Sequence, residues 1–228
     1  QVGYTSSPGS GGYYVAASNK DLSGALVIPS ELEGHKIEYI GNDSYGTLYN
    51  FNDCKYLTSV VIPDTVKYIN SSAFKGCTSL KSVSIPSAGV YISPSAFLGC
   101  TSLESIYLQP SGLGSAAFSG CTSLKSVTFA PSTGKTGYFM ANAFANCTSL
   151  ESIDVPEGVN GFFREAFKGC TSLKSVTLST SFGYLEQDVF KNCTSLQTIT
   201  YKGTSAEWAK IKGVENVSSD ITVVCLGD

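Results

Sequence analysis

Cysteine is the residue type in this chain with the widest range of chemistry, and the 228 residues include eight of them. Cysteines that bind zinc or act as redox pairs lie close together in sequence, for example as C-x-x-C. No two cysteines here are closer than 21 residues, so their spacing contains no metal or redox motif. Seven of the eight instead recur at one position of a repeated segment: Cys54, Cys77, Cys100, Cys121, Cys147, Cys170 and Cys193.

Two interpretations of the repeated cysteines are open. In the one we favour, the seven thiols form a ladder of small buried side chains, one in each of seven equivalent turns. Alternatively, neighbouring cysteines are joined by disulfides, or Cys193 is bridged to Cys225. If the repeats stack, equivalent positions lie about 5 Å apart, which is near the Cα separation of a disulfide. The parallel Cα–Cβ directions of stacked residues would nevertheless make such bridges awkward.

Few other residues are candidates for catalysis. His35 is the only histidine, and it lies in an expected turn, so any serine-based triad would have to use it. The chain contains no G-x-S-x-G elbow, P-loop or G-x-G-x-x-G motif. The acidic pair Glu186 and Asp188 lies in a loop without the facing second carboxylate of a glycosidase. We therefore expect no enzyme activity, no metal, no cofactor and a solvent-exposed His35.

The elements that must position these residues come from the repeat itself. A hydrophobic strand, a turn, an Ala-Phe pair and Gly-Cys-Thr-Ser-Leu follow one another in seven copies, of which Leu80–Cys100 and Leu173–Cys193 are the clearest. The leucines that mark the copies are 23, 23, 21, 26, 23 and 23 residues apart: Leu57, Leu80, Leu103, Leu124, Leu150, Leu173 and Leu196. A fixed period in this range is typical of a solenoid, in which each copy forms one coil stacked on the next.

Each coil is expected to contribute one strand to a parallel sheet and one short return leg. In the copy that begins at Leu80, Val83 and Ile85 are two residues apart and so face the same side of a strand. Gly, Asn or Asp precedes each repeat cysteine, which predicts a left-handed backbone there. The phenylalanine of each turn is expected to join an aromatic spine in the core: Phe74, Phe97, Phe118, Phe144, Phe167 and Phe190.

The limits of the repeat divide the chain into four segments. The pattern Thr204-x-x-Glu207 is a capping box, after which a short helix should run through Trp208 and Ile211 and stop at Gly213. The predicted segments are a flexible N-terminal segment (1–12), an N-terminal cap with a degenerate first repeat (13–56), the repeats of 21–26 residues (57–200), and a C-terminal cap with the short helix and a last strand (201–228).

These motifs resemble the BspA-like leucine-rich-repeat family, whose pattern is roughly F-x-x-C-x-S-L-x-x-V-x-I-P and recurs from about Leu22 to Asp228. The resemblance implies an α/β-type leucine-rich-repeat solenoid that is mostly β. Right-handed stacked coils would carry a parallel sheet on one face and short turns or 3₁₀ pieces on the other. It also implies a surface protein of bacteria or protozoa that acts in adhesion, without shared catalytic residues. A third coil lacking return-leg hydrophobics (Ser111-Gly-Leu-Gly) and a 26-residue fourth coil depart from the pattern.

Composition restricts the class of partner. The net charge is −3 and only 14% of residues are charged, so the chain offers no basic patch for nucleic acid. The longest apolar stretches have the length of strands, and we expect no membrane insertion by this segment. The chain opens with Gln1 and shows no signal peptide or anchor, which we interpret as the start of a mature or truncated chain. An extracellular or cell-surface location is expected.

The outward side of the predicted sheet is the expected binding surface. In each coil, the residues that alternate with the inward positions equivalent to Val83 and Ile85 face outward, and nearly all of them are Ser or Thr. Ser and Thr also suit an exposed strand that binds no partner, so this alternative stays open. Tyr107 is a good anchor for a protein or a glycan, and a carboxylate beside hydroxyls can orient polar groups. The candidate binding residues form one outward row: Ser84, Tyr107, Thr128, Asp154 and Thr177.

The expected function is recognition or adhesion without catalysis. The suspected partner is a host extracellular-matrix or surface protein, or a protein of a neighbouring cell. A glycan is a possible partner as well. A structural spacer that carries another domain or an anchor is the alternative, because a solenoid can also serve only to hold other parts apart.

Overall fold

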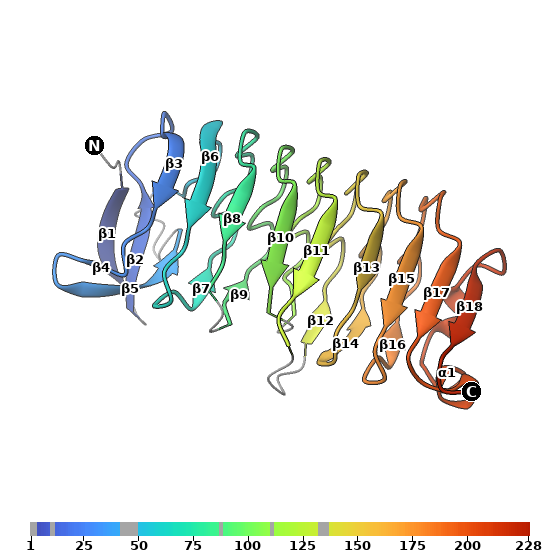
Figure 1. Cartoon of the computed structure of the whole chain (residues 1–228). Helices are drawn as coiled ribbons and strands as arrows, with labels where there is room; N and C mark the ends of the chain where they lie inside the picture. The colour runs from blue at the N-terminus through green and yellow to red at the C-terminus, as the bar shows by residue number, and fades with distance from the viewer. Residues whose placement is uncertain (1–3, 10–11, 42–49, 87–88, 110–111, 132–136) are drawn as a thin grey trace.

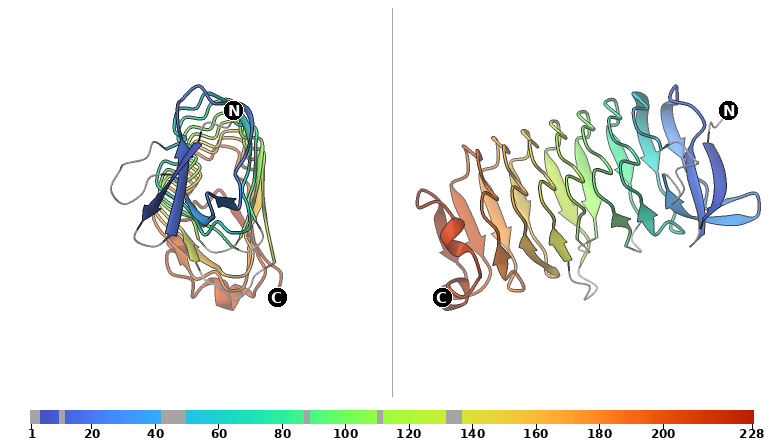
Figure 2. Two further views of the ribbon diagram at one scale, coloured as in Figure 1. Left: turned by 90° about the vertical axis from the view of Figure 1, so that its left-hand side faces the viewer. Right: turned by 180° about the vertical axis from the view of Figure 1, so that it is seen from behind.

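The computed structural model is an elongated solenoid whose coils stack side by side along one axis (Figure 1). The structure describes residues 4–9, 12–41, 50–86, 89–109, 112–131 and 137–228. Seen from its N-terminal end, the coils lie one behind another as a flattened ring with strands on two opposite sides (Figure 2). The predicted mostly-β parallel solenoid is therefore confirmed.

One set of strands lies on one side of the solenoid, which we call the front face. In chain order they are β3 (Ser23–Val27), β6 (Tyr56–Val61), β8 (Ser82–Ser84), β10 (Ser105–Leu108), β11 (Ser126–Phe129), β13 (Ser152–Asp154), β15 (Ser175–Leu178), β17 (Thr198–Tyr201) and β18 (Thr222–Cys225). They pair in parallel within three successive groups, β3-β6-β8, β10-β11 and β13-β15-β17-β18. Each coil thus presents one strand to the front, in the same register as its neighbours.

A second set of strands forms the opposite side, which we call the back face. They are β2 (Gly12–Ala17), β5 (His35–Ile40), β7 (Tyr68–Ile69), β9 (Tyr91–Ile92), β12 (Gly137–Phe139), β14 (Val159–Phe162) and β16 (Tyr184–Leu185). The parallel orders are β2-β5-β7-β9 and β12-β14-β16, and β4 (Glu31–Leu32) pairs antiparallel with β5. Leu113 connects the two groups because it bridges to Ile92 on one side and to Phe139 on the other.

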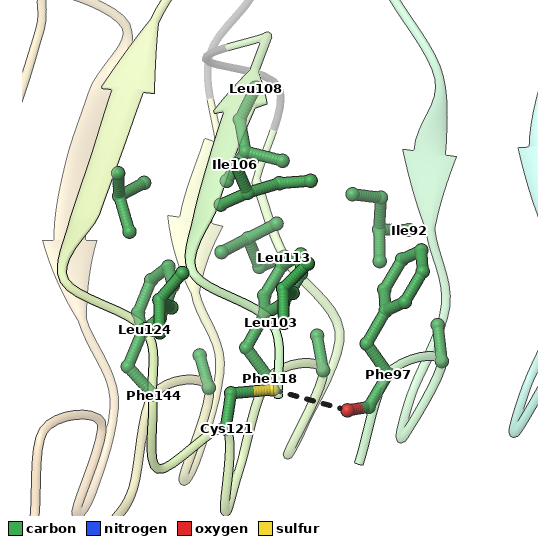
Figure 3. Packing of buried hydrophobic residues seen from close by; sticks show 14 of the residues in the cluster. Ile92, Phe97, Leu103, Ile106, Leu108, Leu113, Phe118, Cys121, Leu124 and Phe144 are labelled. Atoms are coloured by element: carbon green, nitrogen blue, oxygen red, sulfur yellow. Dashed lines mark hydrogen bonds between the residues drawn. The ribbon is translucent and has the colours of Figure 1, made fainter. Parts of the chain in front are cut away.

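Leu113 corrects one expectation about the third coil. The short sequence Ser111-Gly-Leu-Gly seemed to leave this coil without return-leg hydrophobics, but Leu113 is 4% exposed and faces Ile106 and Leu108 of β10 across the core (Figure 3). Gly114 makes the short connection possible, since a Cβ at this position would lie 2.5 Å from the backbone nitrogen of Pro94. The third coil is shorter than its neighbours, and the glycine lets its backbone pass close to the preceding coil.

The phenylalanines form the predicted spine. Rings of adjacent coils stack with centroids 5.2–5.9 Å apart and interplanar angles of 4–21°, within the range of favourable aromatic pairs. Phe51, which lies before the first complete repeat, adds a ring against Phe74 at 5.2 Å. The spine is fully buried from Phe51 to Phe167, and Phe190 at its C-terminal end is half-buried.

Each turn contains two left-handed residues rather than the single one that the sequence predicts. The residue before each repeat cysteine has φ between 59° and 74°, from Asp53 to Asn192, as predicted. Four residues earlier, a second position has φ of 55–60° although it holds Ser, Ala, Asn, Glu or Asp: Ser72, Ser95, Ala116, Asn142, Glu165 and Asp188. Ala and Glu disfavour this conformation, so stacking of the coils must impose it there.

The N-terminal end differs from its prediction in one respect. We expected a flexible segment over 1–12, but Tyr4–Gly9 forms strand β1, which pairs antiparallel with β2 from Tyr4 opposite Ala17 to Gly9 opposite Gly12. The N-terminal cap contains the strands β2, β3 and β5. Its residues 42–49 lie outside the described residues.

The C-terminal cap holds a shorter helix than predicted. Helix α1 (Ser205–Trp208) begins with the predicted capping box, in which the Thr204 side chain accepts from the Glu207 amide and Glu207 accepts from the Thr204 amide. The helix ends at Trp208, before Ile211, and a 3₁₀ turn η1 (Val214–Asn216) follows Gly213. Tyr201 and Trp208 pack with their ring centroids 5.8 Å apart, so the tryptophan covers part of the last coil.

Replacing Phe144 by Ala should test the aromatic spine. The ring contacts Phe118, Phe139 and Phe167, at centroid distances of 5.5, 5.4 and 5.4 Å, and is fully buried. Its loss should lower the free energy of unfolding by about 3–5 kcal/mol, measured by chemical denaturation. The control Ser126→Ala, on the exposed front face, should change it by less than about 0.5 kcal/mol. An equally small effect of Phe144→Ala would contradict a stabilising role of the aromatic spine.

Candidate binding surface

The five predicted binding residues lie in one row on the front face. Parallel pairing aligns Tyr107 with Thr128 and Asp154 with Thr177, and the repeat places Ser84 on the preceding coil. Four of the side chains are exposed and Thr177 is partly exposed. The row also extends further than predicted, because β3 and β18 add Val27, which is 62% exposed, and Val224, which is 40% exposed. Hydroxyls in the middle are thus flanked by apolar ends.

Tyr107 is the largest side chain in the central part of this row. It is 44% exposed, and its neighbours in the row are the small residues Ser84 and Thr128. Within the described residues, its ring stacks on no other ring and its hydroxyl has no hydrogen-bond partner. The ring and the phenolic hydroxyl are therefore both available to a molecule that approaches the front face.

Asp154 has a partner that the sequence did not suggest. Its carboxylate accepts a hydrogen bond from the ammonium of Lys202, 48 residues later, at 3.0 Å. The side chain is still 69% exposed, so the pair is solvated and contributes little to stability. A partner would meet a carboxylate that is already oriented by a lysine rather than a bare negative charge.

A row of alternating charge runs beside the candidate row. The residue after each of the five central repeat leucines, Leu80 to Leu173, is Lys or Glu in turn, and all five are exposed: Lys81, Glu104, Lys125, Glu151 and Lys174. Lys174 donates to Glu151 at 2.8 Å, and this hydrogen bond lowers the pKa of the Glu151 carboxyl. The charges along this row therefore alternate in sign, which favours neutral or mixed-charge partners.

A stripe of tyrosines on the back face was missed by the sequence analysis. Tyr14, Tyr39 and Tyr68 stack at 4.5 and 5.0 Å, and Tyr91 is tilted against Tyr68 at 6.2 Å. Each precedes an inward hydrophobic of its short strand, as Tyr68 precedes Ile69, and this shared position was the available signal. Because most of these rings pack on one another, their faces are less available than that of Tyr107.

The repeat cysteines form a ladder of free thiols. All eight cysteines are free, so the structure contains neither neighbour disulfides nor a Cys193–Cys225 bridge. From Cys77 onwards, each thiol donates to the carbonyl of the phenylalanine one coil earlier, at 3.0–3.3 Å, as Cys121 does to Phe97 (Figure 3). Burial raises the pKa of the thiols of Cys77, Cys100, Cys121 and Cys147, for Cys147 to about 12. Such thiols are poor nucleophiles and serve the stacking of the coils.

The candidate catalytic residues of the sequence make stacking, hydrogen-bond and ionic contacts with neighbouring residues. His35 is exposed, and its ring stacks on Tyr13 at 3.8 Å. Glu186 accepts a hydrogen bond from the backbone amide of Arg164 at 2.7 Å, and Asp188 lies 3.7 Å from the ammonium of Lys191. Among the described residues, no cluster of His, Cys, Asp and Glu could hold a metal ion, and no helix is long and apolar enough to cross a bilayer.

Comparison with known families agrees with the repeated turn and strand. The model of the BspA type leucine rich repeat region matches in six copies, over residues 47–140 and 111–210. The chain belongs to this BspA-type leucine-rich-repeat family. No curated protein matches the sequence. The BspA-type repeats are typically non-enzymatic and bind other proteins, so the family indicates a protein-interaction module.

One of the solved structures that the chain resembles supports the fold of these BspA-type repeats. The leucine-rich repeat protein TpLRR of T. pallidum is 24% identical, with a TM-score of 0.55 over 87% of this chain and 81% of its own. A leucine rich cell surface protein of Faecalibacterium prausnitzii is 17% identical, with a TM-score of 0.32 over 96% of this chain and 97% of its own. The pneumococcal vaccine antigen PcpA is 14% identical, with a TM-score of 0.41 over 97% of this chain and 91% of its own. Only TpLRR is similar enough to support the fold, and its likeness supports the fold alone.

The buried thiols predict a loss of stability at alkaline pH. The pKa of Cys147 is about 12 in the folded chain and about 8.5 in an unfolded one, so the unfolded state loses its proton first as the pH rises. The contribution of this thiol is complete below about pH 8 and is lost between the two values, at up to about 1.4 kcal/mol per pH unit. Denaturation of Cys147→Ala between pH 7 and 10 should therefore show a shallower decline than the native chain.

The control for this experiment is Ser152→Ala, which removes an exposed hydroxyl that does not ionise in this range. It should retain the pH dependence of the native chain. Parallel curves for Cys147→Ala and the native chain would contradict a neutral, buried thiol at this position.

Proposed function

We propose that this chain is a non-enzymatic recognition module of a secreted or cell-surface protein, and that it binds a protein of a host or of a neighbouring cell. Its membership of the BspA-type repeat family supports protein interaction as the general role. The binding surface would be the central part of the front face, around Ser84, Tyr107, Thr128, Asp154 and Thr177.

The observation that carries the proposal is the position of Tyr107. Large, amphipathic side chains surrounded by small polar ones are typical of the residues that dominate binding energy, because the ring can be desolvated and its hydroxyl can still donate. Tyr107 is 44% exposed between Ser84 and Thr128, and its strand β10 pairs with β11 in a regular parallel register. A partner could therefore cover the ring completely without a rearrangement of the chain.

The front face is favoured over the back face for two reasons. Its hydroxyls are spread over many coils, so that a partner surface or backbone can approach closely and find both donors and acceptors. On the back face, the aromatic rings of Tyr14, Tyr39 and Tyr68 are already stacked on one another. Those rings gain less from a new contact than an unpaired ring does.

Binding of the purified chain to fibronectin, fibrinogen, laminin, collagen and mucin glycans would test this function. The double variant Tyr107→Ala/Asp154→Ala should weaken saturable binding to a protein by at least tenfold, about 1.4 kcal/mol. The matched control is Tyr91→Ala, which removes a tyrosine of similar exposure, 46%, from the back face and should bind as the native chain does.

The same panel distinguishes the alternatives. Binding that is lost in Tyr91→Ala and kept in the double variant would move the site to the back face. Saturable binding to mucin glycans alone would favour a glycan-binding module. Absence of binding throughout, with the fold intact, would favour a structural spacer.

A further inference from the structure

The turns of adjacent coils are joined by a regular ladder of backbone hydrogen bonds. In the turns that begin at Ser72, Ser95, Ala116 and Asn142, the first left-handed residue, the phenylalanine and the residue before the cysteine are donors to the next coil, whereas in the turn of Glu165 only the latter two donate. Ser95, Phe97 and Gly99 thus donate to the carbonyls of Ser115, Ala117 and Ser119, at 2.8 Å in each case. The donors are two residues apart, and so are their acceptors. All of these amides must point along the solenoid axis toward the C-terminal end.

The last turn has donors without acceptors. Phe167 and Gly169 donate to the carbonyls of Val189 and Lys191, at 3.0 and 2.8 Å. The equivalent amides of the next turn belong to Asp188, Phe190 and Asn192, and none of the three has a hydrogen-bond partner within the described residues. Three parallel donors, two residues apart, are thus left open at the C-terminal end of the ladder.

The C-terminal cap covers the coil on both sides of this turn but not the turn itself. Strand β18 pairs with β17 on the front, and on the back Lys212 pairs with Tyr184 while Asn216 donates to the carbonyl of Leu185. Between these contacts, the last turn and residues 218–221 of the cap enclose a hollow of about 290 Å³. Its lining includes the apolar side chain of Phe190, the end of the aromatic spine, and the exposed Ser218 and Asp220 of the cap.

The N-terminal end of the same ladder is occupied. There, the carbonyl of Asn50 is in the position that would accept from a preceding turn, and the ammonium of Lys20 donates to it at 2.6 Å. Lys20 also donates to the side-chain oxygen of Asn52 at 2.6 Å. A second copy that stacked its N-terminal turn onto the open C-terminal turn would have to displace Lys20, so the two ends are poorly suited to each other.

We propose that the open C-terminal turn is a docking site for an extended segment of a partner polypeptide. Two or three of its carbonyls, two residues apart, accept from Asp188, Phe190 and Asn192, which is the turn's form of strand addition to an open edge. An aromatic side chain enters the hollow and continues the spine on Phe190, at the spacing of the preceding rings. A cationic residue beside it faces the carboxylate of Asp220. This site is separate from the front-face surface.

The turn of the chain itself supplies a probe for this site. A synthetic peptide with the sequence of residues 163–173, Phe-Arg-Glu-Ala-Phe-Lys-Gly-Cys-Thr-Ser-Leu, with Cys170 replaced by Ala, combines an aromatic residue with an adjacent lysine. Titration of the labelled peptide with the full chain should give saturable binding. Replacement of the peptide's Phe167 by Ala should weaken that binding at least tenfold.

Two variants of the chain locate the binding. Ser218→Trp should fill the hollow and weaken binding at least tenfold at an unchanged melting temperature. Asp220→Lys should weaken binding of this peptide and strengthen binding of one with Lys168→Glu, because the charges are exchanged. The control Asp64→Lys reverses an exposed charge in a distant turn and should leave both affinities unchanged.

Amide exchange measured by nuclear magnetic resonance gives a direct readout of the donors. The peptide should slow exchange of the Phe190 and Asn192 amides and leave that of Asp64 unchanged. The proposal is overturned if the peptide does not bind, if Ser218→Trp binds it normally, or if those two amides exchange equally fast with it. Self-association of the chain that Ser218→Trp abolishes would make the occupant a second copy and would also overturn it. None of these outcomes depends on Tyr107.

Discussion

The hydrogen bonds between adjacent turns are the interaction on which the rest of this molecule depends. Most turns donate three parallel amides to the next coil, and each repeat thiol from Cys77 to Cys193 donates back to the phenylalanine carbonyl of the previous coil. These bonds fix the separation and the rotation of neighbouring coils. The phenylalanine rings stack only because the backbone bonds hold them at a spacing of 5.2–5.9 Å. A cysteine suits the position because it is small and apolar, and its weak S–H donor can still reach a buried carbonyl.

The same regularity explains both candidate surfaces. Since every coil contacts mainly its two neighbours, a feature at one repeat position becomes a row along the solenoid. The front face acquires a row of hydroxyls interrupted by Tyr107, and the back face acquires a stripe of stacked tyrosines. In an interior coil, most backbone donors of the turn are satisfied by the neighbouring coil, so specificity must come mainly from side chains. The ends are different, because there the backbone itself has unused bonds, which Lys20 satisfies at one end and no described residue satisfies at the other.

Departures from the repeat are accommodated locally and do not spread. The short third coil retains its inward leucine, Leu113, and allows a closer approach through Gly114. The left-handed conformation of Ala116 and Glu165 is unfavourable for those residues alone, yet it is the same as that of Asn142 between them. The hydrogen bonds between neighbouring turns hold these residues in the same left-handed conformation. The stacking therefore determines the local backbone where residue preference does not.

The sequence by itself determined what repeats at short range. The period of the leucines, the alternation of Val83 and Ile85, and the Gly, Asn or Asp before each cysteine were sufficient for the solenoid, the strand orientation and one left-handed position. They also placed Ser84, Tyr107, Thr128, Asp154 and Thr177 on one outward row, although not their role in binding. Only the tertiary structure decided the contacts between residues far apart in sequence. The pairing of Asp154 with Lys202, the role of Lys20 at the N-terminal end and the open amides of Phe190 and Asn192 depend on how coils and caps meet. No local pattern encodes these contacts, because the repeat and cap patterns around each residue would be the same if its distant partner were absent.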